Sequence, residues 1–86
     1  MVLPKSFHLK LGQLLRRARV GQGLTQVEVA RCCRTGTQFI SNIERGVCSP
    51  PLYLLARLLV VLRIDKMEVI FLVHGALQRE LDGECR

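Results

Sequence analysis

The chain has 86 residues and a formal net charge of +6, and 49% of its residues are hydrophobic, with no Trp. A chain of this length forms one domain with a modest core, burying roughly 60–65% of its unfolded surface. The longest apolar runs, Leu58–Leu62 and Val69–Val73, are far shorter than the roughly 18 residues that cross a bilayer. The first ten residues also lack the apolar segment of a signal peptide, so we expect a cytoplasmic protein.

The charge is divided unevenly along the chain. Residues 1–63 carry ten Lys and Arg against two acids, a net +8, whereas residues 64–86 carry three against five, a net −2. A basic first part favours binding to a polyanion, and the acidic last part indicates a different role. Charge by itself does not separate nucleic acid from an anionic membrane surface.

Five segments with helical spacing of apolar residues follow one another, separated by glycine, proline or polar residues. They predict helices over about residues 7–20, 25–33, 36–45, 50–62 and 66–81. The run EVIFLV within the last segment could instead form a strand, but no partner strand is evident. The sequence therefore predicts an all-α fold, a compact bundle of about five helices.

Three of these segments begin with a recognisable cap. Thr25 is the expected N-cap of the second segment, and Glu28, three residues later, completes a capping box. Asp65 and Glu68 repeat this pattern at the fifth segment. Ser49 is the expected N-cap of the fourth segment, with the following proline in the first turn, where a missing N–H is tolerated.

The third segment has an unusual outer face. Ile40 and Ile43 are spaced to point inward, and the residues on the other side are polar but uncharged: Thr37, Gln38, Ser41 and Asn42. The second and third segments are short helices joined by a few residues, the layout of a helix-turn-helix, whose second helix enters the DNA major groove. Gln and Asn can bind adenine bidentately, and Thr and Ser can bind base edges or phosphates. We therefore expect this face to meet DNA bases.

The stretch from Leu11 to Val69 resembles the Cro/C1-type (XRE-family) helix-turn-helix of phage repressors and small bacterial regulators. Its most specific pieces are GLTQVEVA at residues 23–30 and ISNIERG at residues 40–46, followed by a proline-led fourth segment. The resemblance implies a bundle of about five helices that binds duplex DNA, usually as a dimer.

The resemblance also implies roles, position by position. The residues at base-reading positions are Thr37, Gln38 and Asn42, with Ser41 beside them. The residues at phosphate-contacting positions are Gln26, Arg45 and Ser49. Arg19 and Glu44 match a pair that ties the first helix to the third. At the surface such a pair contributes less than about 1 kcal/mol, whereas a buried pair mainly fixes the orientation of the helices.

The turn between the second and third segments departs from the family pattern. Arg34 stands where the family usually has Gly, and the N-cap of the third helix, usually Ser or Thr, is Gly36. Gly caps nearly as well as Ser, but a side chain in left-handed geometry costs roughly 1 kcal/mol. We expect a turn of different shape, in which Arg34 adds a phosphate contact.

The last two segments are apolar on two sides. In the fourth, one stripe (Leu52, Leu55, Leu59, Leu62) is assigned to the core, and a second (Leu54, Leu58, Val61) has no obvious cover. In the fifth, the inner side is Val69, Leu72, Val73 and Ala76, and the outer side is Met67, Ile70, Phe71 and Leu77. A helix apolar on both sides must be buried on both, which a two-fold dimer achieves. Within a single domain 1–86, we predict a DNA-binding core over 7–63 and a dimerisation helix over 64–86.

No cofactor or metal site is expected. The cysteines are Cys32, Cys33, Cys48 and Cys85. Adjacent Cys32 and Cys33 do not have the CxxC spacing of zinc or redox sites, and neither His8 nor His74 lies at ligand spacing from them. We expect reduced, mostly buried thiols.

The leading functional hypothesis is a sequence-specific regulator of transcription, a repressor or autoregulator that binds a pseudo-palindromic operator in double-stranded DNA as a homodimer. The alternative is an antitoxin that binds a toxin protein and represses its own promoter, with the fifth helix facing the toxin. A membrane-surface binder is suggested only by charge and aliphatic content, and the helix caps and the Gln/Asn face argue against it. No catalytic constellation is present, because Ser41 and Ser49 have no His nearby in sequence.

Overall fold

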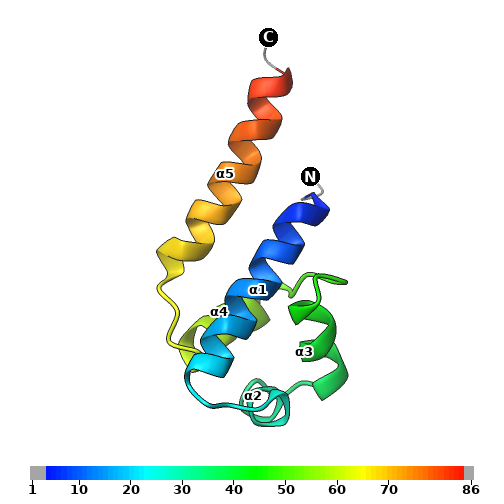
Figure 1. The fold of residues 1–86 in the computed structure, drawn as a ribbon, viewed down its shortest axis with the longest axis vertical. Helices are drawn as coiled ribbons and strands as arrows, with labels where there is room; N and C mark the ends of the chain where they lie inside the picture. Colours follow the sequence, from blue (N-terminus) through cyan, green and yellow to red (C-terminus); the bar gives the residue numbers. More distant parts are fainter. Residues whose placement is uncertain (1–3, 85–86) are drawn as a thin grey trace.

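A computed structural model of the protein describes residues 4–84 and contains five α-helices (Figure 1). They are α1 (Lys5–Gly21), α2 (Gln26–Cys32), α3 (Thr37–Glu44), α4 (Leu52–Val61) and α5 (Lys66–Glu84). The described residues contain no strand, and the run EVIFLV lies within α5. The predicted all-α class and the order of the five helices are confirmed.

Two long helices form the length of the molecule, which measures 46 × 22 × 20 Å. α1 and α5 pack side by side and run in opposite directions, while α2, α3 and α4 gather around the C-terminal half of α1 (Figure 1). The end of α5 extends past the start of α1 (Figure 1). Its last turns therefore lie outside the main body of the fold.

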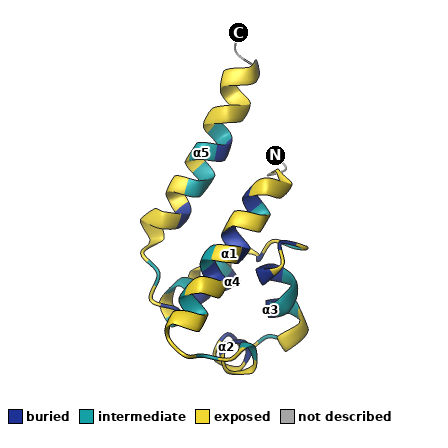
Figure 2. Cartoon of the chain, viewed as in Figure 1, coloured by how far each residue is buried: buried dark blue, intermediate teal, exposed yellow. Residues whose placement is uncertain are grey.

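All five helices contribute apolar side chains to one core, and their inward sides are the buried parts of the chain (Figure 2). The largest fully buried side chains are Leu11, Leu15, Val29, Ile43, Leu58 and Leu62. On α5, Val69 and Ala76 are buried and Ile70 and Phe71 are exposed. The predicted inner and outer sides of α5 therefore agree with the burial.

The predicted faces of α4 are wrong at three positions. Leu54 and Leu58 are buried in the core, whereas Leu52, assigned to the core, is 82% exposed. Val61 is half-buried against the core. α4 is apolar nearly all round, so the spacing of its leucines could not indicate which side faces inward. Leu54 and Leu58 therefore cannot provide an uncovered surface for a partner.

The start of α4 also differs from the expectation. The helix begins at Leu52 with Pro51 as its N-cap, so Ser49 is not the cap and Pro50 is not in the first turn. The reason is local, because Pro50 itself precedes a proline and a residue in that position is driven out of the helical region. The helix therefore cannot include Pro50, and in the structure it begins directly after Pro51.

The caps of the other helices are partly as predicted. At α2 the capping box is present: the Thr25 hydroxyl accepts the Glu28 N–H (3.1 Å), and the Glu28 carboxylate accepts the Thr25 N–H (3.0 Å). Hydrogen bonds from the Thr25 N–H and hydroxyl lower the pKa of Glu28. At α5, Asp65 accepts the Met67 N–H (3.0 Å). The Glu68 N–H donates instead to the backbone oxygen of Asp65, so a second capping box does not form.

Four helices end in the same way, with one residue in the left-handed region. These residues are Gly23 (φ 71°), Arg34 (φ 55°), Gly46 (φ 76°) and Arg63 (φ 56°). After α2, the Arg34 N–H donates to Arg31 and the Thr35 N–H donates to Ala30, the pattern of a Schellman motif. The turn therefore keeps the shape that glycine favours, and the expectation of a different shape is wrong.

α1 approaches the last turn of α3 through a buried glycine. A Cβ added to Gly12 would lie 2.5 Å from the backbone oxygens of both Ile43 and Glu44. The two helices thus meet backbone to backbone, at a distance that only glycine allows. The sequence signal is an isolated Gly within an apolar helical pattern.

Gly12→Ala should destabilise the fold by about 1–3 kcal/mol or more, because the added methyl group forces α1 away from α3. Gly21→Ala is the matched control, since nothing lies within 4 Å of its Cβ position. Thermal unfolding followed by circular dichroism compares the two variants. Equal stability of the two would contradict the close contact.

Candidate nucleic-acid interface

The outer face of α3 is polar and accessible. Thr37 and Gln38 are exposed and Ser41 and Asn42 are half-exposed, whereas Ile40 and Ile43 on the opposite side are buried. The four predicted base-contacting residues therefore lie together on one helical face. α2 precedes this helix and packs against it, which is the arrangement of a helix-turn-helix.

Hydrogen bonds connect the side chains along this face. The Asn42 amide oxygen accepts from Gln38 Nε2 at 3.1 Å and from Arg45 Nη2 at 2.5 Å. An amide has further donors and acceptors, so these bonds leave capacity for a ligand on both Gln38 and Asn42. The three side chains form one pre-oriented unit from the first turn of α3 to its end.

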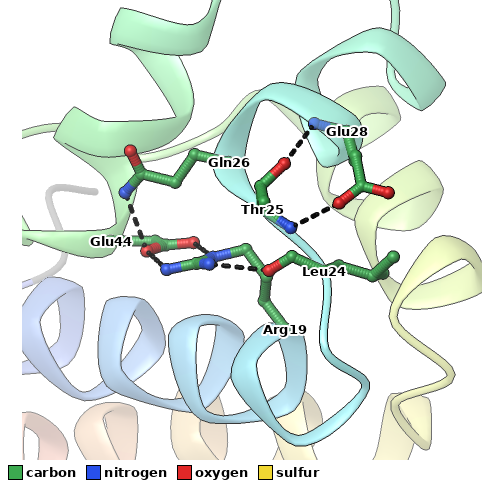
Figure 3. Close-up of polar contacts among 6 residues, drawn as sticks. All are labelled: Arg19, Leu24, Thr25, Gln26, Glu28 and Glu44. Atoms are coloured by element: carbon green, nitrogen blue, oxygen red, sulfur yellow. Dashed lines mark hydrogen bonds and ion pairs between the residues drawn. The ribbon is translucent and has the colours of Figure 1, made fainter.

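At the end of α3 lies an ion pair between Glu44 and Arg19 of α1 (Figure 3). Arg19 Nε donates to Glu44 Oε2 (2.7 Å) and Nη2 donates to Oε1 (3.0 Å), a bidentate arrangement. The side chains are only 12% and 5% exposed. The hydrogen bond to Glu44 raises the pKa of Arg19. The pair is therefore buried, the second of the two alternatives left open by the sequence.

Two further groups complete this network (Figure 3). Arg19 Nη1 donates to the backbone oxygen of Leu24 (2.8 Å), and Gln26 Nε2 donates to Glu44 Oε1 (3.1 Å). No buried side-chain nitrogen or oxygen among residues 4–83 lacks a partner. The network joins α1, the start of α2 and the end of α3. It also holds the half-exposed Gln26, a predicted phosphate contact, in one orientation.

The other predicted phosphate contacts are exposed. Arg34 lies in the turn before α3, and Arg45 lies directly after α3. Ser49 is exposed in the loop before α4, but it is three residues from the helix start. Ser49 is therefore separated from the N–H groups at the start of α4, which it was predicted to cap. The two arginines bracket the polar face at either end of the helix.

Two polar contacts that orient helices were not predicted. Gln22 Nε2 donates to the backbone oxygen of Leu62, which ties the end of α1 to the end of α4. Arg57 Nε donates to the backbone oxygen of Cys32 at 3.2 Å, at the C-terminal end of α2, where a cation is favoured. The available signal for Arg57 was its position as the single charged residue in LYLLARLLVV.

The thiols lie in different environments. Cys33 is buried, and its burial raises the pKa of the thiol, while Cys32 is exposed and Cys48 is half-buried. Cys85 lies outside the described residues. Within residues 4–84, no three His, Cys, Asp or Glu side chains gather in a group that could hold a metal ion. In the same range, every helix is too short or too polar to cross a membrane.

Comparisons with known proteins agree with this geometry. Residues 10–69 match the family model of the helix-turn-helix domain. The clp gene regulator ClgR from Corynebacterium glutamicum is similar, with a TM-score of 0.71 and 27% identity over 91% of this chain and 83% of that chain. The restriction-modification controller protein C.AhdI from Aeromonas hydrophila is similar, with a TM-score of 0.67 and 29% identity over 72% of this chain and 94% of that chain. No curated protein sequence matches.

Glu44→Ala should cost about 3–5 kcal/mol, because it leaves the Arg19 guanidinium buried without its carboxylate partner. The double variant Arg19→Met/Glu44→Leu should recover much of that loss, since no charge is then left buried. Glu28→Ala, at an exposed cap, is the control and should be much milder. Denaturant unfolding gives the free energy of unfolding of all three variants. A Glu44→Ala variant as stable as Glu28→Ala would contradict the prediction that Arg19 needs its carboxylate partner.

Proposed function

The chain belongs to the helix-turn-helix domain family and has the fold of the Cro/C1-type DNA-binding transcription regulators, and from this premise we propose that it is a homodimeric repressor or autoregulator. The observation that carries the proposal is the polar outer face of α3, a helix whose last turn is tied to α1 by the buried Arg19–Glu44 pair. In this role α3 enters the major groove of a pseudo-palindromic operator in cytoplasmic DNA.

Base reading falls to the outer face of α3. Gln38 and Asn42 are suited to adenine, whose N6 and N7 positions match an amide, and Thr37 and Ser41 lie beside them. Their hydrogen-bonded arrangement supports this role, because side chains that are already ordered lose less entropy on binding. Sequence specificity on this proposal comes from four residues within one and a half turns of helix.

Phosphate binding falls to residues around that face. Arg34 and Arg45 lie at its two ends, and Gln26 and Ser49 lie on α2 and on the loop before α4. Contacts of this kind position the helix in the groove without reading sequence. The net charge of +8 in residues 1–63 supplies the wider attraction to the polyanion.

On this proposal, residues 7–63 bind DNA and residues 64–86 pair two chains. The outer side of α5 offers Met67, Ile70 and Phe71, all exposed, and the half-buried Leu77. A symmetric pair presents two recognition helices, about 34 Å apart in proteins of this class, to two half-sites one DNA turn apart. The two similar structures are those of a gene regulator and of a restriction-modification controller protein, which supports a role in the control of gene expression.

Gln38→Ala should weaken binding to the preferred site by about 1–3 kcal/mol, because it removes a base contact, and should have little effect on random DNA. The preferred site is first obtained by selecting bound sequences from random duplexes. Gln78→Ala, an exposed amide on α5, is the control and should leave both affinities unchanged. Equal losses by Gln38→Ala on the two DNAs would move this residue to the phosphate-contacting class.

Binding should weaken steeply as salt concentration rises, because each phosphate contact releases counterions. Arg45→Ala should lower the affinity for all sequences and reduce the slope of log K against log salt by about 1. Arg79→Ala, near the far end of α5, removes the same charge away from α3 and should leave the slope unchanged. A wild-type affinity that does not respond to salt would refute the DNA-binding proposal.

A further inference from the structure

The exposed side of α5 carries a regular seam of side chains. Its members are Met67, Ile70, His74, Leu77 and Leu81, hereafter the outer seam. Their spacing alternates between three and four residues, as do the a and d positions of a coiled coil. Met67, Ile70 and Leu81 are each 41–49% exposed, His74 is exposed and Leu77 is half-buried. The fold thus uses one side of α5 for its own core and leaves the outer seam exposed or half-buried.

We propose that the outer seam pairs with α5 of a second copy in antiparallel orientation, an inference that rests on the dimer proposed above and specifies its register. When a positions are set against d positions, Ile70 lies against Leu81 of the second copy and His74 lies against Leu77 of the second copy. The two-fold axis then passes between Gly75 and Ala76. This register covers Ile70, Leu77 and Leu81 in both copies at once.

Charge supports the antiparallel orientation. The end of α5, residues 79–84, carries one Arg against three acids, whereas α1 carries five Lys and Arg and no acid. α1 packs alongside α5, and the charged residues that line an open groove between the two helices are two bases of α1, Lys10 and Arg17, and one acid of α5, Glu68. An antiparallel pair brings the acidic end of each α5 to the side of the molecule where this basic helix lies in the other copy. A parallel pair would place two acidic ends together.

The shape of the molecule supports it as well. The end of α5 extends past the start of α1 (Figure 1), and residues 78–83 are all exposed, Leu81 among them. In the antiparallel register this projecting end lies along the first half of α5 of the second copy, where Ile70 needs cover. Each projecting end therefore fills the space that the other chain leaves open.

His74 is the single polar member of the outer seam. A polar residue at one a position of a coiled coil selects register and number of chains at a cost in affinity. In the proposed register it faces leucine, so His74→Leu should tighten the dimer, with a dissociation constant at least about threefold lower, and should leave the helical content unchanged. A dimer unaffected by His74→Leu would place His74 outside the interface.

Complementary charges test both orientation and register. Ile70→Glu and Leu81→Lys should each raise the dissociation constant of the dimer at least about tenfold, because each puts an unpaired charge into an apolar seam. The dissociation constant of the double variant Ile70→Glu/Leu81→Lys should be at least about tenfold lower than that of either single variant. Positions 70 and 81 are about 16 Å apart along one helix, so this rescue can arise only between chains.

The matched control is Ile70→Glu/Leu77→Lys, which carries the same two charges but should not be rescued, since these positions do not meet. Analytical ultracentrifugation gives the dissociation constants, and circular dichroism checks that every variant stays helical. Rescue of the control in place of the test pair, or single variants that remain dimeric, would overturn the proposed pairing.

DNA binding, measured on the same samples, separates this inference from the proposed function. A wild type that is monomeric at about 100 μM yet binds duplex DNA in a salt-dependent manner would refute the pairing of α5 and leave the DNA-binding function standing. A wild type that dimerises with the expected rescue but binds no DNA would refute the function and support the pairing.

Discussion

The arrangement of α1, α2 and α3 depends on the buried ion pair between Arg19 and Glu44. A buried pair of this kind adds little net stability, but the loss of one partner is costly, so its main effect is to admit one arrangement of helices. The pair acts together with Gly12, which lies seven residues before Arg19 on the same side of α1. Gly12 meets the backbone oxygen of Glu44 and Arg19 meets its carboxylate. The last turn of α3 is thus fixed at both its backbone and its side chain.

This constraint explains how a short helix can hold a polar face in a fixed orientation. α3 has eight residues, too few for stable helix formation alone in water. Its orientation comes from Ile40 and Ile43 in the core and from Glu44 at its end. The polar residues on the other side of α3 are therefore not needed to position the helix. Gln38 and Asn42 can therefore be replaced by other polar residues without loss of the fold.

Sequence reasoning predicted the features that depend on local chemistry. The five helices, the capping box at Thr25 and the division of α3 into polar and apolar sides all follow from spacing and hydrogen-bonding capacity. The inner side of α4 did not follow, because leucines surround that helix and only tertiary packing selects among them. The turn at Arg34 was also missed. There a cost of about 1 kcal/mol for left-handed geometry is outweighed by two backbone hydrogen bonds and by the docking of α2 against α3.

The projecting end of α5 has a consequence for the dynamics of the chain. Its backbone hydrogen bonds lie outside the core, and segments of this kind open locally at a small fraction of the global free energy of unfolding. In an isolated chain, amide hydrogens near residues 78–83 should exchange with solvent well before those of α1 or α3. When a partner covers this end, part of the binding free energy is lost in ordering the end, so the affinity for that partner is lower. With a lower affinity, the fraction of chains bound to the partner changes with the amount of protein present. The fraction of chains in which the end of α5 is ordered should then rise with the concentration of the protein.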